Sequence, residues 1–529
     1  MSTAILMLIG VIAFILGYIF YGGYVARLVE LDPNKKTPAH TLTDGVDYVP
    51  AKAPVLLGHH FASIAGGGPI VGPIKGAMFG WLPAAIWIVL GSIFIGGVHD
   101  FMSLISSARN EGKSIGEVIK KNIGKSAKTY FLIFVWAALI LVIAVFTILV
   151  AKTFAAVPSA ATASILFMVI ALFMGYFLYQ KGASLGIVTV VAVILLFLSI
   201  WIGIVAPFHL SMKVWIWILI IYIIVASVTP VWVLLQPRDY LNSFLLYTAL
   251  IGGFIGILIG RPAISYPAFI GFNIKGATLF PLLFVIIACG AISGFHSLVS
   301  SGTTSKQLDK ETDAKMIGYG GMLIEGVLAL IAIATVAILT KEGYAQSLGN
   351  GGPIALFSRG LGQFLGYLGI PQKIGMTFGS LTVSAFLLTS LDTATRLGRY
   401  AFEELFSSTP ALSNRFTATG VTVIAGGALA LSGKWATIWP VFGASNQLLA
   451  GLALLSATVW LAHSGRKKWV AFWPMVFMII VTVTALIMLA WTNYAKGNAL
   501  LGTVSLILLI LAIFMIIETM VKKKPEEAA

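Results

Sequence analysis

Cysteine is almost absent from this chain: Cys289 is the only one among 529 residues. A lone cysteine forms no disulfide within the chain and builds no cysteine-ligated metal cluster. Charged side chains are scarce as well, at 10% of the residues. Because an ordinary soluble domain carries about 25% charged residues, this composition excludes that class of protein.

Two enzyme motifs are also missing. The chain has no Gly-x-x-x-x-Gly-Lys-Ser/Thr phosphate loop and no His-Glu-x-x-His zinc motif. Energy from ATP hydrolysis by this chain is therefore not expected. The net charge of +15 would indicate nucleic-acid binding in a soluble protein. Here membrane topology explains that charge better, and no nucleic-acid partner is predicted.

Hydrophobic residues are what the chain has in abundance, at 59%. Apolar runs long enough to cross a bilayer, about 20 residues each, recur along the whole sequence. The first run is too long for a signal-peptide core and lacks a basic leader, so it is predicted to be a retained span. We predict an all-α polytopic membrane protein with about fifteen transmembrane helices. Their cores are 4–24, 56–74, 82–107, 128–151, 162–180, 183–206, 213–236, 240–260, 279–300, 316–340, 374–394, 416–432, 435–461, 469–491 and 499–521.

The distribution of lysine and arginine predicts the orientation. Of the 34 basic residues, 24 fall in alternate connections if the N-terminus is outside and the C-terminus is cytoplasmic. This bias follows the positive-inside rule. The basic amphipathic stretch 115–123 is predicted to lie on the inner membrane surface. Residues 343–371 form most of the longest outer connection, where 353–357 is predicted to be either a short helix that acts as a lid or a plain loop.

A glycine-proline break interrupts the second predicted span. Glycine lowers helix propensity and proline removes a backbone donor, so no helix runs smoothly through Gly66, Gly67, Gly68 and Pro69. At membrane depth, freed backbone groups are tolerated only where protein encloses them or where they line a cavity. Broken helices of this kind are typical of transporter binding sites. We therefore expect the break, together with Ser63, to bind substrate; a simple kink is the alternative.

A second break is predicted in span 213–236, at Pro230, where Ser227 and Thr229 would satisfy freed backbone groups and join the substrate site. The two broken spans start five spans apart, so they run in opposite directions. This is the five-plus-five inverted-repeat plan of many secondary transporters. It divides the chain into residues 1–55 (an extra helix and a cytoplasmic loop), a transport core at 56–395, and a four-helix extension with a charged tail at 396–529.

Ionisable side chains inside spans are costly and indicate function. Those that fall toward the predicted cytoplasmic side are His59, His60, His99, Asp100, His296 and Asp392; Glu325 lies in the tenth span. They are predicted to form an inner gate or a proton path, with a structural network as the alternative. No bound metal and no cofactor are predicted. Arg238 and Asp239 are predicted to form a cytoplasmic gate ion pair, or else an interface anchor.

Five motifs in order resemble one known family. They are the histidine-glycine run at 58–73, Phe-Gly-Trp-Leu-Pro-Ala at 79–84, Gly-Val-His-Asp at 97–100, Gln-Pro-Arg-Asp-Tyr-Leu-Asn at 236–242, and Phe-Gly-Ala-Ser-Asn-Gln-Leu-Leu-Ala at 442–450. Together they resemble the carbon starvation protein A (CstA) family over nearly the whole chain. The resemblance implies a bacterial or archaeal inner-membrane transporter, a role in starvation, and a fold similar to the LeuT-like amino acid–polyamine–cation superfamily. In that superfamily, hydroxyls such as those of Ser297, Ser300 and Ser301 can help to hold sodium; helix packing is the alternative.

The leading functional hypothesis is a secondary active transporter that imports short peptides by alternating access, driven by a proton or sodium gradient. A symporter for pyruvate or another small carboxylate is the alternative on the same scaffold. An ion channel and an intramembrane enzyme are alternatives from other classes. The expected partners are the substrate and the lipid bilayer, and the oligomeric state is left open.

Overall fold

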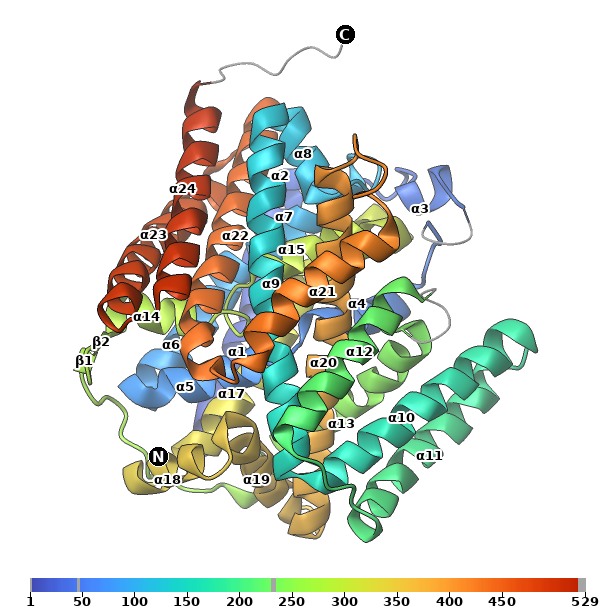
Figure 1. Ribbon diagram of the computed structural model, residues 1–529, viewed down its shortest axis with the longest axis vertical. Coiled ribbons are helices and arrows are strands. Elements are labelled where there is room, and N and C mark those ends of the chain that lie inside the picture. Colours follow the sequence, from blue (N-terminus) through green and yellow to red (C-terminus); the bar gives the residue numbers. More distant parts are fainter. Residues whose placement is uncertain (1, 45–47, 230–234, 522–529) are drawn as a thin grey trace.

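The computed structural model describes residues 2–44, 48–229 and 235–521, and this part of the chain is almost entirely helical (Figure 1). The only strands in it are β1 (Asn273–Ile274) and β2 (Ala277–Thr278), which form a small antiparallel hairpin. The helices of the first half are α1 (Thr3–Leu16), α2 (Gly23–Val29), α3 (Pro38–Thr41), α4 (Ala53–Ile64), α5 (Gly68–Gly76), α6 (Trp81–Gly91), α7 (Gly97–Ala108), α8 (Ile115–Asn122), α9 (Lys125–Ala156), α10 (Pro158–Gly175), α11 (Leu185–Val205), α12 (Met212–Val228) and α13 (Leu235–Gly260). Those of the second half are α14 (Leu279–Ile286), α15 (Gly294–Val299), α16 (Ser305–Gln307), α17 (Gly321–Ala337), α18 (Lys341–Gly349), α19 (Gly352–Gly366), α20 (Gln372–Leu405), α21 (Arg415–Leu431), α22 (Trp435–His463), α23 (Trp469–Ala495) and α24 (Ala499–Val521).

The prediction of an all-α polytopic membrane protein is confirmed. Within the described residues, eleven helices are long and apolar enough to cross a membrane. The other four predicted spans correspond to two interrupted helices, α4–α5 and α14–α15, and to two shorter apolar helices, α12 and α21. The exact number of fifteen crossings stays a prediction.

The connections gather at two opposite ends of the molecule. At one end, the Arg109 guanidinium donates to Glu311 over 2.7 and 2.9 Å, and Arg466 lies 3.1 Å from Glu30. The backbones of Lys36 and Lys310 pair there in an isolated antiparallel β-bridge. We call this the α8 end, at the top of Figure 1, where α24 also finishes. The connections predicted to be cytoplasmic therefore do meet on one side.

The opposite end, which we call the α18 end, lies at the bottom of Figure 1. There the amide of Thr3 donates to Pro262, the amide of Ser265 donates to Ala337, and the hydroxyl of Tyr344 donates to Ile74 over 2.9 Å. Residues 353–357 lie within α19, so the helix alternative is correct for them. Helices α18 and α19 pack together at this end of the molecule.

The first predicted break is present. Helix α4 ends at Ile64 and α5 begins at Gly68, with non-helical backbone between them. The space here is tight, so a larger residue would displace its neighbours: a Cβ at Gly67 would lie 2.3 Å from Leu387 Cδ2, and one at Gly66 would lie 2.4 Å from Ser390 Oγ. The glycines therefore serve close packing against α20 as well as the break itself.

The partner of the first break is not the span predicted for it. Helix α12 runs to Val228 without interruption, and Pro230 falls outside the described residues. The interrupted helix that meets α4–α5 is instead α14–α15, which has non-helical backbone between Ile286 and Gly294. The predicted pairing of the first break with span 213–236 was wrong, because proline is the stronger helix breaker in sequence, whereas the interruption between α14 and α15 contains Gly290 and is followed by Gly294.

The two interrupted helices pack against each other in opposite directions. A Cβ at Gly72 of α5 would lie 2.7 Å from the carbonyl oxygen of Ile286 at the end of α14. A Cβ at Gly68 would lie 2.4 Å from Cys289 Sγ in the second break. Helix α5 therefore contacts α14, and α4 contacts α15. The essential prediction, two opposed broken helices that meet inside the molecule, holds with this changed partner.

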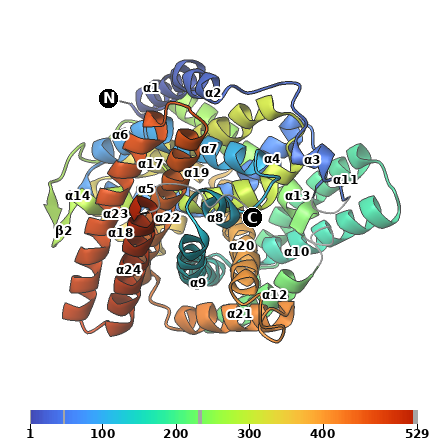
Figure 2. The same ribbon diagram turned by 90° about the horizontal axis from the view of Figure 1, so that it is seen from above.

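The helices that follow each break repeat in order and length. A helix of 32 residues (α9) in the first half corresponds to one of 34 (α20) in the second, and these two pack together. Helices α12 and α21 have 17 residues each and also pack together, and α13 and α22 have 26 and 29. This order makes α10 and α11 an inserted hairpin. Figure 2 places that hairpin on one flank and α23 with α24 on the other.

The predicted division into 1–55, 56–395 and 396–529 stays a prediction, but both of its boundaries fall within helices, since α4 already begins at Ala53. Residue 395 lies within α20, which is continuous from Gln372 to Leu405. Moreover, α21 packs against α9 and α22 packs against α15. By contact, α21 and α22 belong with the core rather than with the C-terminal extension.

Side chains from other helices satisfy the backbone groups that the second break frees. Asn446 accepts a hydrogen bond from the amide of Phe295 over 2.9 Å, and Gln447 donates to the carbonyl of Phe284 over 3.0 Å. Trp87 of α6 donates to the carbonyl of Ile287 over 3.0 Å. Polar side chains of α22 and α6 thus hold the non-helical backbone between α14 and α15 in place.

Replacing Asn446 with leucine should destabilise the fold. The Asn446→Leu variant keeps the branched shape of the side chain but leaves the buried amide of Phe295 without an acceptor, at a cost of about 1–3 kcal/mol. We expect the thermal midpoint of the detergent-purified protein to fall by a few °C. Ser456→Ala on the same helix is the matched control, because the Ser456 hydroxyl is buried and has no partner within the described residues. Equal midpoints for the two variants would contradict this role of Asn446.

Candidate functional site

A very small cavity lies where the two breaks meet, with a volume of about 10 Å³, which is room for about one water molecule. Ligand sites usually occupy about 300–1,000 Å³, so this structure shows the site in a nearly closed form. The pocket is largely apolar and is lined by Ile64, Gly66, Gly68, Val142, Phe146, Cys289, Phe295, Ser390 and Phe442. Residues of both breaks contribute, as the transporter hypothesis requires.

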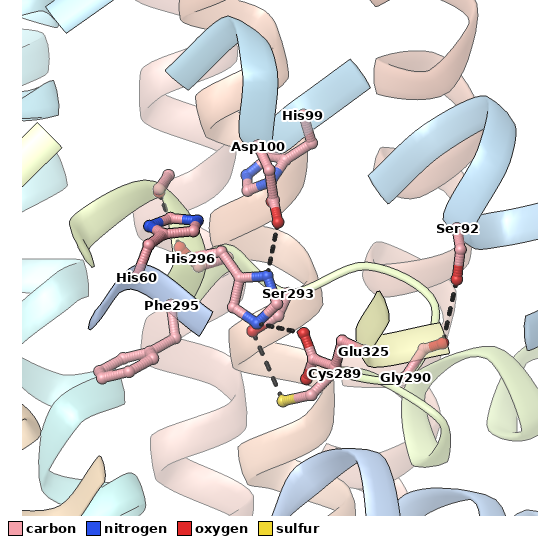
Figure 3. Close-up of polar contacts among 12 residues, drawn as sticks. His60, Ser92, His99, Asp100, Cys289, Gly290, Ser293, Phe295, His296 and Glu325 are labelled. Carbon is pink, nitrogen blue, oxygen red and sulfur yellow. Dashed lines mark hydrogen bonds and ion pairs between the residues drawn. The ribbon is translucent and has the colours of Figure 1, made fainter. Parts of the chain in front are cut away.

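A buried chain of titratable side chains lies beside this pocket (Figure 3). Asp100 of α7 is central: its Oδ1 lies 2.6 Å from His99 Nδ1 and its Oδ2 lies 2.8 Å from His296 Nδ1. On the other side of the ring, His296 Nε2 lies 3.2 Å from Glu325 Oε2 of α17. All four side chains are buried, with at most 1% of their surface exposed. The predicted convergence of His99, Asp100 and His296 is therefore present, and Glu325 joins them.

The two adjacent histidines of α4 point in different directions, as the helical rotation of about 100° per residue requires. His60 Nδ1 lies 2.8 Å from Thr304 Oγ1, beyond the end of α15. A Cβ at Gly321 would approach the same ring within 3.3 Å, so His60 also packs against α17. His59 is only partly buried. Of this pair, His60 is thus the residue fixed next to the buried chain.

The three predicted serines also lie on the inner half of the second broken helix. Ser297 donates to the carbonyl of Gly294 over 2.7 Å, and Ser301 donates to the carbonyl of Ser297 over 2.7 Å. Ser301 also accepts from the amide of Ile115 over 3.1 Å, which ties α8 to this helix. The Ser300 hydroxyl is buried and has no partner within the described residues. Two of the three serines are therefore hydrogen-bonded within the protein, whereas the Ser300 hydroxyl oxygen is free to bind a ligand.

A second buried network joins α12, α13 and α20. The Arg238 guanidinium bonds to Asp392, to Asp239 over 2.9 Å, and to the hydroxyl of Tyr222 over 2.7 Å. Tyr222 in turn donates to Asp392 over 2.7 Å. Arg238 is fully buried. The Arg238–Asp239 pair is thus present, but it is one part of a larger network that includes Asp392.

This second network is close to the first break along α20. Asp392 follows Ser390, whose hydroxyl packs against Gly66, by two residues. Thr389, one residue earlier than Ser390, donates to Asp239 over 3.2 Å. Movement of α4 against α20 would therefore act on both the pocket and the Arg238 network.

Two predicted substrate residues are not at the pocket. The Ser227 hydroxyl lies 3.2 Å from Thr419 Oγ1, and the Ser227 carbonyl accepts from Arg399. The carbonyl of Thr229 accepts from Arg396 over 2.9 Å. Both residues cap the end of α12 against α20 and α21, and neither lines the pocket. Their assignment followed from placing the second break in the wrong span.

Ser63 and Pro69 lie at the first break without lining the pocket. The Ser63 hydroxyl donates to the carbonyl of His59 over 2.9 Å, and Pro69 occupies the first turn of α5, where its missing amide costs no hydrogen bond. Gly67 is pressed against Leu387. Among the described residues, no group of three His, Cys, Asp or Glu side chains has the arrangement of a metal site.

Sequence patterns indicate only some of the residues that complete these networks. Glu325 stands out as an acid within an apolar run. Tyr222, Thr304 and Asn446 carry no such signal, because tyrosine, threonine and asparagine are common in membrane helices and only the fold shows their partners. The second break was visible only as Gly290 and Gly294.

Comparison with known proteins establishes the family. The family model described as "Carbon starvation protein CstA" matches residues 2–348 and 345–485. The chain belongs to the CstA family. The peptide transporter CstA of Campylobacter jejuni is 33% identical, with 95% of this chain and 82% of the relative covered. The peptide transporter CstA of Escherichia coli K12 is 34% identical (92% and 81%), and the pyruvate/proton symporter BtsT of the same strain is 33% identical (92% and 81%).

A solved structure has the same fold. A manganese transporter of Eremococcus coleocola, crystallised with an aromatic bis-isothiourea compound, aligns with a TM-score of 0.53 at 14% identity. The alignment covers 90% of this chain and 99% of that one. At this identity the likeness shows the fold alone, and it confirms the LeuT-like, inverted-repeat architecture. This CstA-family chain is a multi-pass membrane protein of a transporter family.

Filling the first break should abolish transport. In Gly67→Leu, the new side chain meets Leu387, whose Cδ2 would lie 2.3 Å from the Cβ. The two interrupted helices could then not change their packing, so uptake into proteoliposomes should fall to background while protein still reaches the membrane. Gly420→Leu on α21 is the control, because no atom lies within 4 Å of a Cβ there. Normal uptake by the Gly67 variant would contradict the assigned role of the break.

Proposed function

We propose that the chain is a secondary active transporter that imports short peptides by alternating access and is driven by protons. It would lie in a bacterial or archaeal inner membrane with its α18 end outside and its α8 end in the cytoplasm. The observation that carries the proposal is the buried His99–Asp100–His296–Glu325 chain beside the meeting point of two broken helices. The relatives named as peptide transporters support the substrate class.

The chain of four groups favours a proton as the coupling ion. Two carboxyl groups and two imidazoles are held in contact without exposed surface, on three different elements, α7, α15 and α17. Adding or removing one proton changes the net charge of a site from which water is largely excluded, and such a change is costly unless the contacts rearrange. Protonation would therefore bias how α15 packs against α7 and α17.

Sodium is the alternative coupling ion, and one observation supports it. The open hydroxyl of Ser300 and that of Ser390 beside Gly66 are oxygen ligands near the breaks, and neither has a partner within the described residues. Hard cations prefer oxygen ligands in larger numbers than these two supply. The buried titratable chain is the more developed structure, so protons are preferred.

A symporter for pyruvate or a similar small carboxylate is the second candidate. It is supported by the relative named a pyruvate/proton symporter, which has the same identity to this chain as one of the peptide transporters. A closed form shrinks any pocket, so transport itself must decide between the two candidates.

The other classes have less support. The comparisons give transporters, so an ion channel is not favoured. For an enzyme, residues 182–186 do have the spacing Gly-x-Ser-x-Gly. Ser184, however, precedes α11 as its N-cap, and within the described residues its hydroxyl is hydrogen-bonded to no histidine. We therefore propose that the chain is not an enzyme.

Uptake into proteoliposomes tests the proposal directly. Labelled dialanine and labelled pyruvate would each be offered with a pH gradient alone, a sodium gradient alone, and neither. We expect accumulation of dialanine with the pH gradient alone. Accumulation of pyruvate only would move the function to the alternative, and accumulation of neither under either gradient would reject both.

Replacing Asp100 with asparagine should break coupling. The Asp100→Asn variant keeps the shape but removes the charge shared by His99 and His296, so pH-driven accumulation should fall at least about tenfold. Exchange of labelled for unlabelled substrate should persist, because the pocket is not altered. Glu342→Gln, an exposed acid on α18, is the control. Unchanged pH-driven accumulation would show that Asp100 is purely structural.

A further inference from the structure

Positive charge dominates the α18 end of the chain. The basic residues outside the connections predicted to be cytoplasmic are Lys75, Lys152, Lys213, Arg261, Lys275, Lys341, Arg359, Lys373, Lys434 and Lys496. The connections at that end contain a single acid, Glu342. Such an excess of one sign raises the local concentration of anions and speeds their arrival.

Two of these lysines converge on one aromatic ring. Lys75 Nζ of α5 lies 4.9 Å from the ring centre of Trp435 of α22, and Lys152 Nζ of α9 lies 5.5 Å from the same centre. Lys75 Nζ also lies 5.9 Å from the ring of Trp439. Three helices of the core thus bring two cations and two indole rings together. A bound anion at this ring would therefore have two cations within reach.

The cluster has donors but no acceptor. Within the described residues, neither lysine has a carboxylate within the 4.0 Å limit of an ion pair. Trp439 is 1% exposed, and its indole N–H has no hydrogen-bond partner in the same part of the chain. An unpaired buried donor is costly, so the Trp439 N–H is available to an acceptor that binds there.

The N-terminus of α19 adds positive charge next to Lys152. A Cβ at Gly352, the first residue of that helix, would lie 3.1 Å from Lys152 Nζ. Helix N-termini carry partial positive charge and free amides, which attract anions. Lys152 therefore lies against an already positive helix end, an arrangement that an anion would stabilise.

The cluster lies on the path toward the pocket. Lys152 follows the pocket residue Phe146 by six positions on α9, a rise of about 9 Å along the helix. Trp439 precedes the pocket residue Phe442 by one turn of α22, with their rings 5.3 Å apart. Phe146 and Phe442 also touch, with ring centres 5.7 Å apart. The two phenylalanines thus separate the lysine cluster from the pocket.

We propose that Lys75, Lys152 and the Trp439 indole form an entry site for a carboxylate group at the α18 end, which the substrate occupies before it passes Phe146 and Phe442. The inference rests on the proposed function, since it assigns the part of the substrate that is recognised first. A peptide C-terminus and a 2-oxo acid share this group. The site therefore serves either substrate class.

Binding to the detergent-purified protein tests the site without transport. Isothermal titration would use dialanine, dialanine amide and pyruvate as probes. We expect dialanine to bind and its amide, which lacks the charge, to bind at least about tenfold more weakly. Binding of pyruvate alone would keep the carboxylate site and assign it to the smaller acids. Equal binding of dialanine and its amide, or no binding of any probe, would overturn the proposal.

Variants assign the binding to these residues. Lys75→Met should weaken binding of the carboxylate probe and raise the KM for uptake about tenfold or more, with little change in maximal rate. Lys75→Arg keeps the charge and should recover most of the affinity, and Trp439→Phe should lose several-fold by removing the donor. Lys373→Met removes an exposed charge at the same end and is the control.

The outcomes separate this site from the transport function. Weaker binding in Lys75→Met, in a protein that accumulates no substrate, would preserve the site and reject the transport proposal. Uptake by Lys75→Met with unchanged KM would preserve transport and reject the site. If Lys75→Met fails to fold, the Lys75→Arg and Trp439→Phe variants give the same decision.

Discussion

Interrupted backbone inside an apolar slab is the constraint on which this structure depends. Each break in a membrane helix frees amides and carbonyls that find no water, so every one needs a partner or a cavity. In the second break those partners are side chains of Asn446, Gln447 and Trp87, contributed by α22 and α6. In the first break, glycines let α20 approach so closely that a single added carbon would collide with Leu387 or Ser390. The two breaks are therefore stable only together with the helices around them.

Function follows from where the charges lie relative to these breaks. The Asp100–His296–Glu325 contacts join α7, α15 and α17 on one side, and the Arg238–Asp392 network joins α12, α13 and α20 on the other. Both networks are buried, so each is strongly stabilised only while all its members stay in contact. A change in the packing of α4 or α15 must break or remake such contacts, and a coupling ion can bias that step. This gives alternating access a physical basis in the structure.

Most of the fold could be predicted from the sequence, but only part of the candidate site could. Hydropathy, the positive-inside bias and the run Gly66–Pro69 predicted a helical membrane protein, its two ends and the first break, because lipid leaves few alternatives to a helix. The second break was misplaced, since Pro230 is a stronger local signal than Gly290 and Gly294, and the stabilising Asn446 lies far away in sequence. Buried charges such as Asp100 and His296 were identified because they are rare in spans. The contact of His296 with Glu325, the contact of His60 with Thr304, and the approach of Lys75 and Lys152 to the same Trp435 ring depend on packing that no local pattern records.

Modification of the single cysteine tests the central claim most directly. Cys289 lies in the second break and lines the pocket, and a Cβ at Gly68 would lie 2.4 Å from its sulfur, so an added group there leaves no room for the breaks to close. The measurement is the rate at which methyl methanethiosulfonate labels Cys289 in proteoliposomes, with and without dialanine or pyruvate, followed by uptake. The account predicts that the transported substrate slows labelling and that labelled protein no longer transports. Labelling at the same rate with either substrate, together with normal uptake by fully labelled protein, would contradict it.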